Sequence, residues 1–116
     1  MGVRGGLAGG VKRGEVRWYR FAAPDKQRPV LVLTRDSSLG VLATATVAPV
    51  TSSVRGVRSE VLLTEADGMR QPCAVNLHGA VTVRQRLLGP CIARLSPQRM
   101  AEVCAALGFA LGCDSA

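Results

Sequence analysis

The apolar residues of this 116-residue chain fall into short runs separated by turn-forming residues, and the last run alone has helical spacing. Short runs rich in Val, Ile and Thr are typical of β-strands. We expect strands at residues 15–21, 30–34, 41–50, 57–64, 73–77 and 80–83, with a further one at 87–95. Many short strands at close spacing predict a sandwich or a small barrel.

One run, Val30–Leu33, contains no polar residue, and such a run suits a strand that is buried on both faces. It follows Arg28 and Pro29, and a proline fits the beginning of a strand better than its middle. This run is therefore predicted to be a central strand that starts near Arg28.

The end of the chain has the features of one amphipathic helix. Ser96 is a good N-cap, and Pro97 suits the first helical position. Apolar residues then recur at helical spacing, at Met100, Val103, Leu107 and Leu111. The predicted fold class is thus mainly β with one C-terminal helix.

The length allows one domain, which we place at residues 13–113 after a mobile, glycine-rich leader at 1–12. No signal peptide or long apolar segment is present, so we expect a cytoplasmic protein without a membrane segment. The four cysteines form no C-x-x-C pair, which argues against a zinc site. Buried, free thiols are expected, with no metal and no cofactor.

The charge is strongly positive: 15 Lys and Arg against 8 Asp and Glu give a net charge of +7. Thirteen of the fifteen are arginine, which suits planar, bidentate phosphate contacts. RNA or DNA is the favoured partner of such a surface, although an acidic protein segment would fit it as well, and solubility alone is the plain alternative.

Three polar groups lie where strands begin or end. Arg28 stands at a rigid strand start, although it would also suit a surface turn with Asp25. The hydroxyls of residues 51–53, followed by Arg55, can bind phosphate, although such residues also form ordinary turns. Asn76 and His78 can read a base or transfer a proton, or else satisfy a turn. Motifs of serine-triad hydrolases, P-loops and H-E-x-x-H metalloproteases are absent. These residues alone indicate a basic β domain that binds nucleic acid.

The order of several sequence blocks resembles the MazF/PemK toxin family. The blocks are Arg13-Gly14-Glu15-Val16, Gln27 to Leu33 with its R-P-V-L-V core, Val47 to Ser52, Glu60-Val61 and the tail Leu95 to Val103. The resemblance spans about residues 13–112. One difference stands at residues 76–82, where relatives read E-Q-I-R-T or N-L-D and this chain reads N-L-H-G-A-V-T.

The resemblance implies an SH3-like barrel, a homodimer and an endoribonuclease that cuts single-stranded RNA without a metal and is inhibited by an acidic antitoxin. It implies that Arg28 and Thr51 are catalytic. We expect the RNA to be bound by residues around them, namely Gln27, Ser52, Ser53, Arg55, Asn76, His78 and Thr82. The implied products are a 2′,3′-cyclic phosphate and a 5′-hydroxyl. A nucleic-acid-binding barrel without catalysis and a protein-interaction module remain the alternatives.

Overall fold

The fold was analysed in a computed structural model that describes residues 10–22 and 26–114. The strands are β1 (Glu15–Arg20), β2 (Gln27–Val32), β3 (Thr44–Thr51), β4 (Glu60–Leu63), β5 (Cys73–Asn76), β6 (Val81–Arg84) and β7 (Cys91–Arg94). The α-helices are α1 (Asp36–Leu39) and α2 (Pro97–Leu111), and three single-turn 3-10 helices are η1 (Glu65–Asp67), η2 (Leu77–Gly79) and η3 (Gln85–Leu87).

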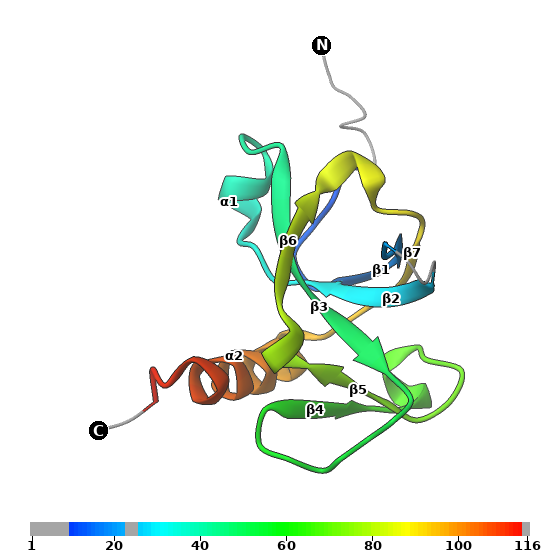
Figure 1. The fold of residues 1–116 in the computed structure, drawn as a ribbon, viewed down its shortest axis with the longest axis vertical. Coiled ribbons are helices and arrows are strands. Elements are labelled where there is room, and N and C mark those ends of the chain that lie inside the picture. The colour runs from blue at the N-terminus through cyan, green and yellow to red at the C-terminus, as the bar shows by residue number, and fades with distance from the viewer. Residues whose placement is uncertain (1–9, 23–25, 115–116) are drawn as a thin grey trace.

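The seven strands form one antiparallel sheet in the order β4-β5-β3-β2-β1-β7, with β6 also paired to β3. Strand β3 is the longest and contacts three neighbours, because β6 pairs with its first half and β5 with its last two residues. Helix α2 lies beside β4 and β5, while α1 lies at the other end of the molecule (Figure 1). The predicted mainly β fold with a C-terminal helix is confirmed.

Two groups of buried side chains form the core on the two sides of the central strands. The larger group packs β2, β3, β4 and β5 against α2, with Leu31, Leu63, Leu77 and Val103 at most 1% exposed. The smaller group gathers around Val30, Val32 and Val47. Residues 30–33 are all buried, which confirms the prediction that this run is covered on both faces.

Helix α2 begins and ends as the sequence predicts. The Ser96 hydroxyl accepts a hydrogen bond of 3.1 Å from the Arg99 N–H, and Pro97 follows it. Gly112 ends the helix with a φ of 77°, a conformation that glycine adopts without strain. Within the described residues, no helix has the length and apolarity needed to cross a membrane.

Some predicted boundaries are wrong. The strand predicted at 41–50 begins at Thr44 as β3. Val41 and Leu42 are exposed and belong to the connection between β3 and the helical turn at residues 36–39. Residues 57–59 belong to a loop, so β4 starts at Glu60. The segment 87–95 is interrupted before β7, since its first residue ends η3 and Gly89 and Pro90 follow. Apolar composition alone did not separate these connections from strands.

Two further expectations concern the ends and the cysteines. Residues 1–9 of the expected leader, and Asp25 of the alternative turn with Arg28, lie outside the described residues. The Lys12 N–H donates a 2.9 Å hydrogen bond to Glu15.

The four cysteines are free thiols, but Cys73 alone is buried, so the expectation of buried thiols is wrong for the other three. Burial raises the pKa of the Cys73 thiol.

An ion pair joins α2 to the turn between β4 and β5. Arg99 Nε and Nη2 donate to the two oxygens of Asp67, at 2.9 and 3.2 Å. Burial raises the pKa of Asp67, but the bonds from Arg99 and from the Thr64 N–H outweigh burial and hold that pKa below its usual range. A carboxyl with a lowered pKa stabilises the fold above its unfolded-state pKa, and this stabilisation is lost as the pH falls through the folded-state pKa.

We expect Asp67→Asn to lower the free energy of unfolding at pH 7 by about 1 kcal/mol, because it removes a charged hydrogen-bond acceptor. Urea unfolding at several pH values measures the difference from wild type. The difference should shrink below about pH 4, because the carboxyl of the unfolded wild type takes up a proton there before the carboxyl of the folded protein does. A difference that stays constant down to pH 2 would assign the loss to packing instead of charge.

Candidate active site

The strand pairing brings polar residues from distant parts of the chain to one face of the sheet. Thr51 of β3 lies opposite Ala74 of β5. Asn76 is two residues further along β5 and lies opposite Glu60 of β4. Paired residues in antiparallel strands point to the same face, and so do residues two apart in one strand. The side chains of Thr51, Asn76 and Glu60 therefore share a face.

Arg28 joins this face from β2. The pairing of β2 with β3 sets Val30 opposite Pro49. The pairing ends there, and Arg28 and Thr51 each lie two residues beyond this last pair, where β2 and β3 part. Although they are far apart in sequence, both line the same pocket.

A pocket of about 260 Å³ lies over this face. It contains both predicted catalytic residues and four of the predicted RNA-binding residues. The lining is Arg28, Pro49, Thr51, Ser53, Arg55, Val57, Ser59, Glu60, Asn76 and His78. With two arginines, hydroxyl groups, an amide and an imidazole around one cavity, the lining can bind a phosphate diester and contact an adjacent base.

The Thr51 hydroxyl is oriented by the loop that follows it. Its oxygen accepts a hydrogen bond of 3.0 Å from the Ser53 N–H. A hydroxyl has one proton to donate in addition to the bonds that its oxygen accepts. Thr51 can therefore donate that proton to a phosphate oxygen in the pocket while its own oxygen stays fixed.

Asn76 and His78 are held by a tight turn at the end of β5. The Asn76 side-chain oxygen accepts a 3.2 Å bond from the His78 N–H and caps η2. Gly79 ends that turn so close to β3 that an added Cβ would lie 2.8 Å from Pro49 Cγ. This glycine lets the turn carrying His78 approach the strand that carries Thr51.

Three predicted RNA-binding residues do not line the pocket. Gln27 and Ser52 are exposed neighbours of Arg28 and Thr51 along their chains. Thr82 lies opposite Thr46 in the β3–β6 pair, and their hydroxyl oxygens are 3.2 Å apart. Because Thr46 and Thr51 are five positions apart on β3, they point to opposite faces. Thr82 therefore lies away from Arg28 and Thr51.

Glu60 is a charged residue of the pocket lining that is not among the predicted site residues. Its Oε1 accepts hydrogen bonds of 3.0 Å from the N–H groups of Arg55 and Gly56. Glu60 belongs to a block that carries the family resemblance, but its spacing gives no sign that the carboxylate turns back to the preceding loop. Among the described residues, no group of three or more His, Cys, Asp or Glu side chains is arranged to hold a metal ion.

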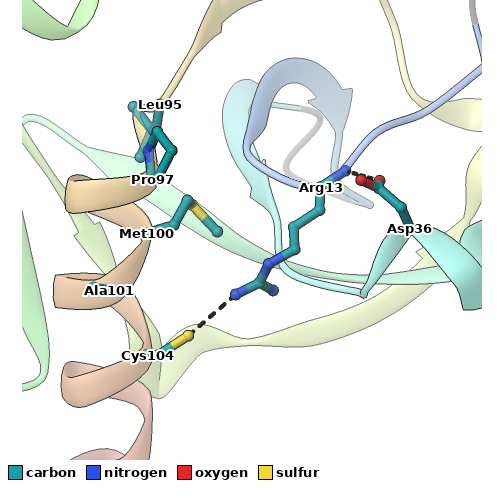
Figure 2. A pocket seen from close by; sticks show the side chains of 7 residues that line it. All are labelled: Arg13, Asp36, Leu95, Pro97, Met100, Ala101 and Cys104. Atoms are coloured by element: carbon teal, nitrogen blue, oxygen red, sulfur yellow. Dashed lines mark hydrogen bonds between the residues drawn. The ribbon is translucent and has the colours of Figure 1, made fainter.

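A second pocket, of about 420 Å³, lies between the start of β1 and helix α2 (Figure 2). Arg13 crosses it: its backbone N–H donates to Asp36 at 2.8 Å, and its guanidinium donates to the Leu33 carbonyl and, at 3.1 Å, to Cys104 Sγ. Most of the remaining lining is apolar, including Leu95 and Met100. Arg13 thus connects α1, the residue that follows β2, and α2, which gives it a structural role.

Comparison with known proteins places this geometry in context. Residues 12–111 match a family described as PemK-like, MazF-like toxin of type II toxin-antitoxin system. The probable endoribonuclease MazF5 of Mycobacterium tuberculosis is 40% identical over 103 residues, which cover 88% of this chain and 94% of that protein. Endoribonuclease MazF3 of the same species is 35% identical over 99 residues, covering 85% and 96%.

Solved structures give the same result. Mycobacterium tuberculosis toxin MazF-mt6 superposes with a TM-score of 0.77 at 32% identity, covering 84% of this chain and 96% of that one. A MazE-MazF crystal structure from Deinococcus radiodurans gives a TM-score of 0.74 at 28% identity, covering 88% and 96%. These likenesses confirm the predicted SH3-like fold with its C-terminal helix.

Proposed function

The chain belongs to the PemK-like, MazF-like family of toxins of type II toxin–antitoxin systems, and we propose that it is an endoribonuclease whose active site is the Arg28–Thr51 pocket. The observation that carries this proposal is the convergence of Arg28, Thr51, Arg55 and His78 on one small cavity. The substrate is single-stranded RNA, because its unstacked bases and backbone are accessible to a pocket of this size.

The proposed reaction is attack of a ribose 2′-oxygen on the adjacent phosphorus, with departure of the 5′-oxygen of the next nucleotide. The 2′-hydroxyl loses its proton to a base, and the leaving oxygen gains one from an acid. Arg28 stabilises the charge that develops on the phosphate, and Thr51 donates a hydrogen bond to one of its oxygens. His78 is suited to proton transfer. The products are a 2′,3′-cyclic phosphate and a 5′-hydroxyl, and the reaction uses no metal.

The decisive experiment incubates the purified protein with a long single-stranded RNA in EDTA and maps the ends of the fragments. We expect cleavage at short sequence motifs, with 2′,3′-cyclic phosphate and 5′-hydroxyl ends. RNA that stays whole while binding in a salt-sensitive way would favour a non-catalytic nucleic-acid-binding barrel instead. Cleavage that EDTA abolishes would contradict the metal-independent reaction.

An acidic antitoxin and a second copy of the chain are the proposed protein partners. The net charge of +7 suits an acidic segment, and a structure from Deinococcus radiodurans is of MazE with MazF. Strand β4 is an edge strand on which Leu62 is 53% exposed, and helix α2 beside it ends at Leu111, which is 66% exposed. An unpaired edge with exposed apolar residues suits a protein interface.

Light scattering on the purified chain tests the proposed homodimer, for which we expect a mass of twice 12.2 kDa. Leu62→Glu should shift the protein toward monomer, and an unchanged dimer would place the interface elsewhere. Because messenger RNA is translated in the cytoplasm, we expect the protein to act there.

A further inference from the structure

The pocket contains one carboxylate that the proposed reaction does not use, and it belongs to Glu60. This residue begins β4, opposite Asn76, and its side chain is partly buried against the pocket. It follows the loop of residues 52–59, which connects β3 to β4 and contributes Ser53, Arg55, Val57 and Ser59 to the pocket lining.

Glu60 closes this loop through three hydrogen bonds. Its Oε1 accepts from the N–H groups of Arg55 and Gly56, each at 3.0 Å, and its own N–H donates to the Val57 carbonyl at 3.0 Å. Gly56 has a φ of 73°. Two successive N–H groups that converge on one oxygen form a nest, a backbone arrangement that binds an anion. Here the anion in the nest is the carboxylate of Glu60.

The middle of the loop has little else to order it. Residues 52–58 are exposed, so burial of apolar side chains does not fix the loop's shape. One end is tied by the bond from the Ser53 N–H to the Thr51 hydroxyl, and the other by Arg58, which lies over the Phe109 ring at 4.2 Å, and by the buried Ser59. Between these ends, the carboxylate of Glu60 holds the backbone of Arg55 and Gly56. Without that carboxylate, Arg55 would sample many positions around the pocket, and ordering it on the RNA would cost conformational entropy.

We propose that Glu60 is a positioning residue of the RNA-cleaving site: its carboxylate holds the Arg55–Gly56 nest and so fixes Ser53 and Arg55 against the pocket. This inference rests on the proposed function. In this proposal Glu60 acts as a hydrogen-bond acceptor, through the oxygen that receives both N–H groups, and not as the base of the reaction.

Two substitutions separate these roles. Glu60→Ala removes the acceptor and the charge, whereas Glu60→Gln removes the charge and keeps a carbonyl oxygen as acceptor. Any effect of lost charge on RNA binding is shared by the two variants, so their difference reports the acceptor. Glu65→Ala, at an exposed position in η1, is the matched control for a Glu-to-Ala change.

We expect Glu60→Ala to lower kcat/KM for RNA cleavage about 10- to 100-fold, because a displaced binding group costs up to roughly 10²-fold in rate. Glu60→Gln should stay within about threefold of wild type and keep its pH–rate profile. Equal losses of 10²-fold or more in both variants would overturn the proposal in favour of proton transfer by Glu60. Activity of Glu60→Ala equal to that of Glu65→Ala would overturn it as well.

Amide hydrogen exchange gives a readout that does not depend on RNA. Exchange at Arg55 and Gly56 should be faster in Glu60→Ala than in wild type, and close to wild type in Glu60→Gln. Unchanged exchange in Glu60→Ala would show that the carboxylate does not hold the loop. A wild-type protein that leaves RNA whole would overturn the proposed function and the catalytic part of this inference, while the exchange data would still decide whether Glu60 orders the loop.

Discussion

Arg28→Ala is expected to lower the rate of RNA cleavage by about 10²–10³-fold, which is the typical cost of removing a group that stabilises transition-state charge. Arg28 is exposed at the start of β2 and lines the pocket beside Thr51. Its guanidinium can contact two phosphate oxygens at once, and alanine leaves the developing charge to solvent. Single-turnover cleavage of a defined single-stranded RNA in EDTA measures the effect.

Arg70→Ala is the matched control. Arg70 is an exposed arginine before the start of β5, which is the end of that strand opposite to Asn76. Both variants lose one positive charge, so non-specific attraction to RNA falls to a similar extent. We expect Arg70→Ala to cleave within about twofold of wild type, as is usual for a surface change away from the site. Similar rates for the two variants would show that Arg28 contributes charge alone and would remove it from the catalytic site.

Most of the fold could be predicted from local patterns. The apolar run at 30–33 predicted a buried central strand, and Ser96-Pro97 predicted where α2 begins. The connections were harder, because Val41, Leu42 and Val57 are apolar but exposed. An isolated run cannot show whether it meets a neighbouring strand, and burial depends on that tertiary contact.

The candidate site could be predicted in part, for a reason that lies in strand register. Arg28 lies near the start of β2 and Thr51 ends β3, and these strands are antiparallel, so the two residues come to the same end of the pair once β2 and β3 are aligned. The family resemblance groups Thr82 with them, but its pairing with Thr46 places it on the other face. A shift of one residue in register reverses the face of every side chain, and sequence spacing does not determine that register.

Leu77 illustrates how the core supports the site, and Leu77→Ala is expected to lower the free energy of unfolding by about 2–5 kcal/mol. Its side chain is 1% exposed in the larger core group, which also includes residues of α2. Asn76 and His78, its neighbours in sequence, line the pocket. Urea unfolding at one fixed protein concentration measures the loss, since association of subunits would make the result depend on concentration.

Leu42→Ala provides the control, because it removes the same atoms from a side chain that is 51% exposed. We expect that change to cost at most about 0.5 kcal/mol. A similar loss in both variants would mean that Leu77 is not a core anchor. If Leu77→Ala lowers RNA cleavage at a temperature where it is fully folded, the cavity has also loosened the turn of Asn76 and His78. The same buried leucine would then determine both the stability of the domain and the geometry of its pocket.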